Sequence, residues 1–155
     1  MVNAYFLDTS ALVKRYIAET GSNWIQSITE NATNSKLALA QITWVEVLSA
    51  MSRRQREGSL SESDFDSICR DFREDFDLEY RVIEVDQALF ERAGQLVIRY
   101  PLRAYDAVQL ASALRCRSGL TQTPGTQLVF VSADNRLLNI AQTEGLVTDN
   151  PNNYP

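Results

Sequence analysis

Short apolar stretches recur along this chain at intervals that suit a sheet covered by helices. Between them, apolar residues stand three or four positions apart, as in Leu89, Ala93 and Leu96, and this spacing predicts amphipathic helices. The apolar stretches themselves are short and rich in β-prone residues. They predict strands at residues 5–7, 37–39, 81–85 and 128–131.

This alternation of strands and helices indicates an α/β fold. The predicted strands have few polar positions, which is typical of parallel strands buried on both faces. We therefore expect a central parallel sheet of four to five strands flanked by helices on both sides. At 155 residues the chain suits a single domain, which we place at residues 1–148, with residues 149–155 as a C-terminal tail. In open sheets of this class, ligands bind beyond the C-terminal ends of the strands.

Four acidic residues fall at that edge of the predicted sheet. Asp8 directly follows the first strand and Asp134 the fourth, whereas Glu46 and Asp106 begin apolar helical segments. Taken singly, Asp8 and Asp134 suit helix caps, Asp106 suits the positive end of a helix, and Glu46 suits solvent or an arginine of its own helix. Their shared position sets them apart, because carboxylates gathered in one place repel one another unless protons or cations neutralise them.

The composition narrows the chemistry of such a site. The chain has no histidine, which excludes Ser-His-Asp and Cys-His catalysis, paired-histidine nuclease mechanisms and imidazole-bound zinc. Carboxylates and water are the usual ligands of Mg²⁺ or Mn²⁺, and a metal held this way suits phosphodiester hydrolysis. We therefore expect metal-dependent hydrolysis, with one ion in the free protein, at Asp8, Glu46, Asp106 and Asp134.

The remaining composition limits the compartment. Cys69 and Cys116 match no metal-binding spacing, so we expect buried thiols in a reducing compartment rather than a disulfide or a zinc site. No apolar run approaches the roughly 20 residues that cross a membrane, and the first residues lack the pattern of a signal peptide. We expect a cytoplasmic protein that makes no contact with a membrane.

The segments around the four acids resemble the ordered motifs of a known family. They are LDTSAL at 7–12, VEVL at 45–48, AYDA at 104–107 and SADNRL at 132–137. In this order and at these intervals they closely resemble the motifs of PIN-domain ribonucleases, particularly the VapC-like toxins of prokaryotic toxin–antitoxin systems. The resemblance covers almost the whole chain, from the first predicted strand to the last predicted helix.

The resemblance implies a PIN-like fold, Mg²⁺- or Mn²⁺-dependent cleavage of RNA, a cognate antitoxin protein that blocks the site, and a homodimer. By analogy, the four acids are the metal ligands. A hydroxyl of Thr9 or Ser10 would support Asp8 or a metal-bound water, although a helix cap explains Ser10 equally well.

The formal net charge of −5 opposes RNA binding, so an RNA substrate would depend on local clusters of arginine. Such clusters are also typical of solvated faces. The strongest candidates are Arg53, Arg54, Arg103 and Arg136, and the weaker ones are Arg56, Arg115 and Arg117. A separate apolar helical face, compatible with either a protein–protein surface or the core, consists of Phe65, Ile68, Phe72 and Phe76.

Other classes of protein share parts of this pattern. A haloacid-dehalogenase-like phosphatase needs a second Asp where this chain has Ser10, and a catalytic lysine, for which only Lys14 and Lys36 are available. A receiver-type signalling domain needs paired acids near the first strand and a lysine after a late strand, and the chain has neither. The alternative from another class is a catalytically weak PIN-like module that binds RNA or protein. Because all four acids are present, the sequence favours the enzyme.

Overall fold

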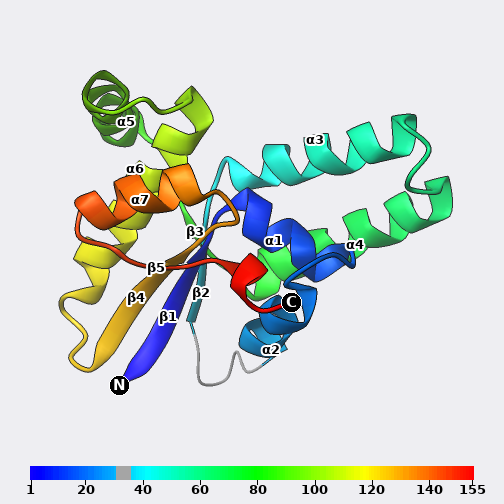
Figure 1. The fold of residues 1–155 in the computed structure, drawn as a ribbon, viewed down its shortest axis with the longest axis horizontal. Helices are drawn as coiled ribbons and strands as arrows, with labels where there is room; N and C mark the ends of the chain where they lie inside the picture. Colours follow the sequence, from blue (N-terminus) through cyan, green and yellow to red (C-terminus); the bar gives the residue numbers. More distant parts are fainter. Residues whose placement is uncertain (31–35) are drawn as a thin grey trace.

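A computed structural model describes residues 1–30 and 36–155 of the chain (Figure 1). Within these residues, five parallel strands form one sheet in the order β3-β2-β1-β4-β5. The α/β class and the expected parallel sheet of four to five strands are confirmed. In chain order the strands are β1 (Val2–Leu7), β2 (Lys36–Ala40), β3 (Arg81–Ile83), β4 (Thr126–Val131) and β5 (Val147–Asp149).

Helices connect the strands, and most begin where the sequence provides a cap. The Ser61 hydroxyl accepts a hydrogen bond from the Asp64 N–H (3.1 Å), and Asp86 accepts one from the Leu89 N–H (2.9 Å). The helices are α1 (Thr9–Tyr16), α2 (Ser22–Glu30), α3 (Thr43–Arg56), α4 (Glu62–Leu78), α5 (Gln87–Arg99), α6 (Ala104–Leu120) and α7 (Asn135–Thr143), followed by a short 3₁₀ helix, η1 (Pro151–Asn153).

Alternate residues of β1, β2 and β4 enter two hydrophobic clusters on opposite faces of the sheet. Ala4, Phe6 and Phe130 pack with α5, α6 and α7, whereas Leu7 and Val131 pack with α1, α2, α3 and α4. Figure 1 shows the two groups of helices on either side of the strands. Burial on both faces explains why the strands read as apolar runs in the sequence.

The apolar face of α4 belongs to the second of these clusters. Phe72 is fully buried, and its ring stacks on that of Trp44 with the centroids 5.2 Å apart. Phe65, Ile68 and Phe76 pack against the same cluster. The interpretation of this face as core is therefore the correct one.

Two expectations about local structure change, and one strand is additional. The strand predicted at 81–85 ends at Ile83. The strand Val147–Asp149 was not predicted as an element. Both cysteines are free thiols, but only Cys116 is buried, because Cys69 lies half-buried on α4. None of the described helices is long and apolar enough to cross a membrane.

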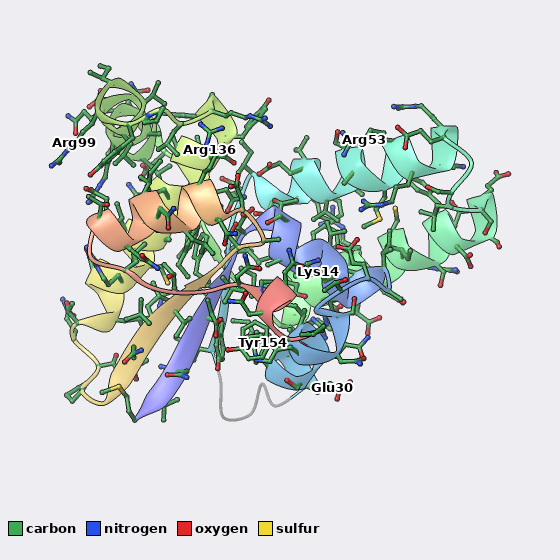
Figure 2. The ribbon with its side chains drawn as sticks, viewed as in Figure 1. Lys14, Glu30, Arg53, Arg99, Arg136 and Tyr154 are labelled. Carbon is green, nitrogen blue, oxygen red and sulfur yellow. The ribbon has the colours of Figure 1, made fainter. Side chains whose placement is uncertain are left out.

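The last residues, expected as a tail, lie against the domain. Pro151 is buried, and the ring of Tyr154, which Figure 2 labels, stacks on that of Trp24 with the centroids 4.6 Å apart. The loop before α2 approaches η1 so closely that a Cβ at Gly21 would collide with the Pro151 carbonyl. Gly21 also has a φ of +88°, which favours glycine. The C-terminal segment and this loop therefore fix each other.

The strand order places a topological switch point beside β1. From β1 the chain moves outward through β2 to β3, and it later returns to the other side of β1 as β4. Ligands of open parallel sheets bind where the strand order reverses, beyond the C-terminal ends of the strands. In this fold that place is the end of β1 and β4.

Candidate active site

A pocket of about 480 Å³ opens at the ends of β1 and β4. All four acids that the sequence analysis selected line it, together with Thr9 and Ser10. We call it the acid-lined pocket. Its other lining residues are Val13, Lys14, Glu19, Ala50, Arg53, Arg54, Arg103 and Ala133.

Asp8 is buried at the end of β1, where it caps α1 and accepts three hydrogen bonds. The Ser10 N–H donates to Oδ1 (3.2 Å), while the hydroxyls of Ser10 (3.0 Å) and Ser132 (2.6 Å) donate to Oδ2. Burial raises the pKa of Asp8, the three donors oppose this rise, and the charge of Asp134 adds to it. Asp8 is thus both a helix cap and a pocket carboxylate, so the two interpretations do not compete.

Ser10 and Ser132 join the ends of the two strands. Their hydroxyl oxygens lie 3.3 Å apart, and each also accepts a backbone hydrogen bond, from the N–H of Ala133 and of Asp134 respectively (both 3.0 Å). Ser10 therefore supports Asp8 directly and holds residues 132–134 against it.

Glu46 is half-buried on the first turn of α3, where Gln109 of α6 holds it. The Gln109 Nε2 donates to Glu46 Oε1 (2.8 Å) and also lies close to the hydroxyl oxygens of Thr43 (2.9 Å) and Thr9 (3.2 Å). Burial raises the pKa of Glu46, and hydrogen bonds from Gln109 and Thr9 oppose this rise. Thr9 therefore supports the Glu46 side of the pocket. The sequence-based alternative of an arginine partner for Glu46 gives way to this glutamine.

Asp106 and Asp134 complete the pocket from the starts of α6 and α7. Asp134 Oδ1 caps α7 by accepting hydrogen bonds from the backbone N–H groups of Arg136 (2.9 Å) and Leu137 (3.4 Å). Burial raises the pKa of Asp106, and the charges of Asp8 and Asp134 raise it further, while Arg103 and Arg136 oppose the rise. The two helix starts thus place both acids within electrostatic reach of β1.

The donor set and its charge fit a hard divalent cation. Asp8, Glu46 and Asp106 each have a raised pKa to which another acid of the pocket contributes, and a bound cation would offset this repulsion. Among the described residues, no three acidic side chains stand close enough together to ligate one ion. Asp8, Glu46 and Asp134 direct an oxygen at a protein donor instead. Metal binding therefore requires these side chains to turn toward one another.

The four arginines selected as the strongest RNA-binding candidates all border the acids. Arg53, Arg54 and Arg103 line the acid-lined pocket, and Arg136 lines an adjoining hollow that includes Asp106 and Asp134. Figure 2 shows Arg53 on α3 and Arg136 at the start of α7, on different sides of the fold. A polyanion that enters the pocket would therefore meet positive charge at the rim.

Two of the weaker arginine candidates have structural partners elsewhere. Arg115 pairs with Asp86 (2.8 Å), and Arg117 donates to the carbonyl oxygen of Glu144 (3.0 Å). Neither lines the acid-lined pocket. Arg56, in the last turn of α3, is likewise absent from its lining.

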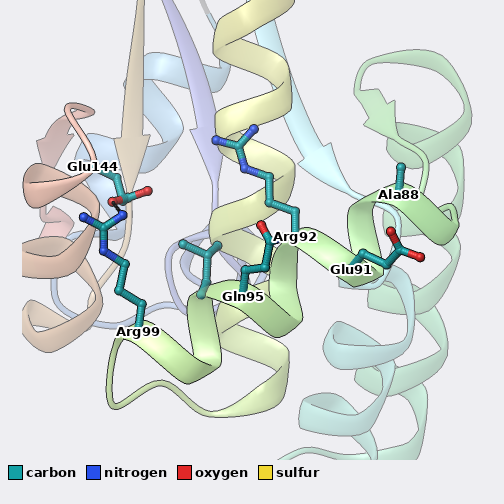
Figure 3. A pocket seen from close by; sticks show the side chains of 7 residues that line it. Ala88, Glu91, Arg92, Gln95, Arg99 and Glu144 are labelled. Atoms are coloured by element: carbon teal, nitrogen blue, oxygen red, sulfur yellow. Dashed lines mark ion pairs between the residues drawn. The ribbon is translucent and has the colours of Figure 1, made fainter.

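A second hollow, of about 400 Å³, lies between α5 and the end of α7 (Figure 3). Its charged groups are of both signs and occur in equal number: Glu91 and Glu144 with Arg92 and Arg99. Arg99 forms an ion pair with Glu144 at 3.8 Å. With no gathering of like charges, this hollow lacks the feature that distinguishes the acid-lined pocket.

The sequence analysis missed two side chains of the site, Gln109 and Ser132. Gln109 stands three residues after Asp106 in an apolar helical run, so it shares a helix face with that acid. A polar side chain in such a run requires a partner. Ser132 directly follows β4, the position that Asp8 has after β1. Ser132 begins the segment SADNRL and Gln109 lies two residues after AYDA, and these positions were the available indications.

Comparison with known proteins identifies the family. The PIN domain model matches residues 5–142. Ribonuclease VapC45 of Mycobacterium tuberculosis is 36% identical over 112 residues, which are 70% of this chain and 74% of the relative. VapBC2 from Rickettsia felis, solved with a promoter DNA fragment, matches with a TM-score of 0.64 at 14% identity over 95% of this chain and 98% of that chain. A toxin–antitoxin complex from Klebsiella pneumoniae matches with a TM-score of 0.63 at 19% identity over 95% and 97%.

The structural matches share the fold of this chain, whereas the family model and the M. tuberculosis relative match its sequence. The matched segment, 5–142, contains all four acids of the pocket as well as Gln109 and Ser132. This chain belongs to the PIN-domain family.

Proposed function

We propose that this protein is a metal-dependent ribonuclease that hydrolyses phosphodiester bonds of RNA. The observation that carries the proposal is the convergence of four carboxylates in one pocket, where burial and neighbouring acids raise the pKa of Asp8, Glu46 and Asp106. The name of the M. tuberculosis relative, a ribonuclease, supports RNA as the substrate. Presence of all four acids argues against the alternative of a catalytically weak binding module.

In this proposal Asp8, Glu46, Asp106 and Asp134 hold Mg²⁺ or Mn²⁺. When bound, the ion supplies a nucleophilic hydroxide at neutral pH and offsets charge on the leaving oxygen. The protein contributes position: the two serine hydroxyls fix Asp8, and Gln109 with Thr9 fixes Glu46.

The arginines at the rim bind the RNA backbone. Arg53, Arg54 and Arg103 line the pocket beside the acids, so phosphates that contact them would place the next phosphodiester near the carboxylates. Arg136 extends this positive rim to the start of α7.

We further propose that the chain is the toxin of a toxin–antitoxin pair, that a cognate antitoxin covers this pocket, and that the toxin acts in the cytoplasm as a homodimer. The support is that two structural neighbours are a VapBC and a toxin–antitoxin complex. A small reading frame beside the gene should encode the antitoxin. Its product should bind this chain and abolish cleavage; a product that binds without affecting cleavage would contradict the proposal.

Metal removal tests the activity. Purified chain free of antitoxin should cleave single-stranded RNA with Mn²⁺ or Mg²⁺, lose cleavage in EDTA and regain it when Mn²⁺ is restored. Asp106→Asn should lower the rate by orders of magnitude at every metal concentration, whereas Asp77→Asn, which changes an exposed acid of α4, should not. Equal cleavage with and without EDTA would overturn the mechanism.

A further inference from the structure

Two cations of the acid-lined pocket share one carboxylate. The Lys14 Nζ lies 3.2 Å from Glu19 Oε1, and the Arg54 Nη2 lies 3.8 Å from Glu19 Oε2. Lys14 comes from α1, Arg54 from α3 and Glu19 from the loop before α2, and all three line the pocket. Glu19 thus bridges two helices at the wall of the candidate active site.

Lys14 is the fixed member of this group. Only 7% of its side chain is exposed, compared with 28% for Arg54 and 34% for Glu19. An ammonium group carries three donors, and within the described part of the chain Lys14 uses one of them, toward Glu19. A buried cation with donors to spare needs an anion beside it, and in the free protein that anion is Glu19.

The loop that carries Glu19 is well defined. The backbone N–H of Glu19 donates to the Ser22 hydroxyl (2.9 Å), and the Ser22 N–H donates to the Glu19 carbonyl (3.1 Å). Gly21 of the same loop packs closely against η1. The backbone of Glu19 is therefore fixed, while its one-third exposed carboxylate has water to turn into. Exchange of the anion is possible at the side chain without moving the loop.

Glu19 also differs from the other acids of the pocket. The lining holds five acids and four cations, and among the described residues Glu19 is the one acid of the five with an ion pair. The single negative charge of Glu19 thereby offsets part of the positive charge of Lys14 and Arg54 before any substrate binds. A phosphodiester carries one negative charge on two oxygens, as a carboxylate does, and is the matching replacement.

We propose that Lys14 and Arg54 form a binding site for a backbone phosphate of the RNA, and that Glu19 occupies this site in the free protein as an internal competitor. The inference rests on the proposed ribonuclease function. RNA binding would turn the Glu19 carboxylate into solvent and place one phosphate between the two cations. The free-energy cost of binding this phosphate would then be limited to the exchange of anions, because Lys14 and Arg54 are already in position.

The test measures RNA binding separately from cleavage. In an inactive Asp106→Asn protein with Mn²⁺ present, the Kd for a labelled 12-nucleotide single-stranded RNA of mixed sequence is measured by fluorescence anisotropy over a range of salt. Glu19→Gln should lower the Kd roughly 3- to 10-fold, because the two cations become free for phosphate. The slope of log K against log salt should steepen by up to about 0.7, the value for one further phosphate contact on a single strand.

The matched control is Glu57→Gln, which removes the same charge from an exposed position after α3. If Glu57→Gln gives the same gain as Glu19→Gln, the effect is one of net charge and the inference fails. Arg54→Gln should weaken binding several-fold and should reduce the gain from Glu19→Gln; a full gain in the double variant would also overturn it.

Arg54→Gln also provides a test that does not depend on Glu19→Gln folding. Arg54 is partly exposed, so the single variant should fold, and unchanged RNA affinity in that variant would overturn the inference. The two proposals fail in different ways. If the parent chain neither binds nor cleaves RNA, the proposed function and this inference fail together. If the parent chain cleaves RNA normally but Glu19→Gln and Glu57→Gln change the RNA affinity equally, this inference fails alone.

Discussion

Two groups of polar side chains, most of them buried or half-buried, lie near β1, and they differ in how their charged groups are paired. The first, the Arg15–Tyr80 network, joins α1 to α4 and the residue before β3. Arg15 pairs with Glu79 (2.8 Å) and Asp75 (3.5 Å), and the Tyr16 hydroxyl donates to Asp75 (2.7 Å) and lies 2.8 Å from that of Tyr80. Burial raises the pKa of Tyr16, which therefore stays neutral.

In the acid-lined pocket, by contrast, the central carboxylates have hydrogen-bond donors but no ion-pair partner within the described residues. Asp8 accepts three hydrogen bonds and Glu46 is held by an uncharged glutamine, while burial and neighbouring acids raise the pKa of both. In the first network both carboxylates pair with Arg15, and the network stabilises the fold. Carboxylates without such an ion pair mark a site that takes its positive charge from a ligand.

The largest expected effect is a loss of cleavage without a loss of stability, on substitution of a pocket acid. Asp8→Asn should lower the rate of RNA cleavage about 1000-fold at saturating Mn²⁺, because a charged metal ligand is lost. The melting temperature should change little, since Asn also caps helices and one buried charge disappears. A cleavage assay paired with a thermal melt measures both, and a rate within a few-fold of the parent chain would contradict the role of Asp8.

In the Arg15–Tyr80 network we expect the opposite result, a loss of stability without a loss of cleavage. Arg15→Met should lower the free energy of unfolding by about 1 to 3 kcal/mol, because Asp75 and the partly exposed Glu79 lose the cation that both contact. RNA cleavage per folded molecule should be unchanged. Denaturant titration gives the loss, and Asp77→Asn, which breaks an exposed pair with Arg73, is the control at about 0.5 kcal/mol or less. If cleavage falls by more than the fraction of folded protein does, the claim that this network affects stability alone is contradicted.

A smaller effect is expected at the residue that holds Glu46. Gln109→Leu should lower the cleavage rate roughly 10- to 100-fold and raise the Mn²⁺ concentration needed for half-maximal activity, as loss of a ligand's support does. The free energy of unfolding should also fall, by about 1 to 3 kcal/mol, because leucine leaves Glu46 and the buried Thr43 hydroxyl without the Nε2 donor. Gln109→Glu, which places a second carboxylate beside Glu46, should damage stability as well. Normal metal dependence in Gln109→Leu would show that Glu46 needs no such support.

The smallest effect is a pH dependence of unusual sign. Burial and neighbouring acids raise the pKa of Asp8, Glu46 and Asp106, so these groups bind protons more tightly in the folded than in the unfolded chain. Their contribution to stability is therefore present at low pH and is lost as pH rises from their ordinary values, 3.8 for Asp and 4.5 for Glu, through the raised ones.

In EDTA, the melting temperature of the parent chain should consequently fall more steeply with rising pH than that of Asp106→Asn across this window. Saturating Mn²⁺ should reduce the difference, because the ion replaces the protons. Identical pH profiles for the two proteins would show that repulsion among the pocket acids has no measurable effect on stability.

The sequence predicted the sheet and the acids for the same reason. Strands buried on both faces read as apolar runs, and the residue after such a run, such as Asp8, must stand at the edge of a parallel sheet. β5 escaped prediction because its three residues are too few to show a period. The C-terminal segment was read as a tail because its contacts, Tyr154 on Trp24 and Pro151 against Gly21, depend on residues far away in the sequence.

The supporting residues were harder to predict than the acids. Helix α6 is buried continuously from Ala107 to Leu114, so its pattern does not reveal that Gln109 faces Glu46. The arginines show the same limit. The residues around Arg103 and Arg115 do not indicate that Arg103 lines the pocket whereas Arg115 pairs with Asp86. Which side chains meet across a site depends on how helices pack, and periodicity alone does not contain that information.

The position of β1 in the sheet has a consequence for synthesis. β1 is synthesised before its partner β4, and the hydrogen bond between Asp8 and Ser132 spans 124 positions. Contacts of such high sequence separation form late in folding. A nascent chain that lacks β4 therefore has no complete acid-lined pocket, and the translated message is exposed to that pocket only after β4 and the start of α7 have been made.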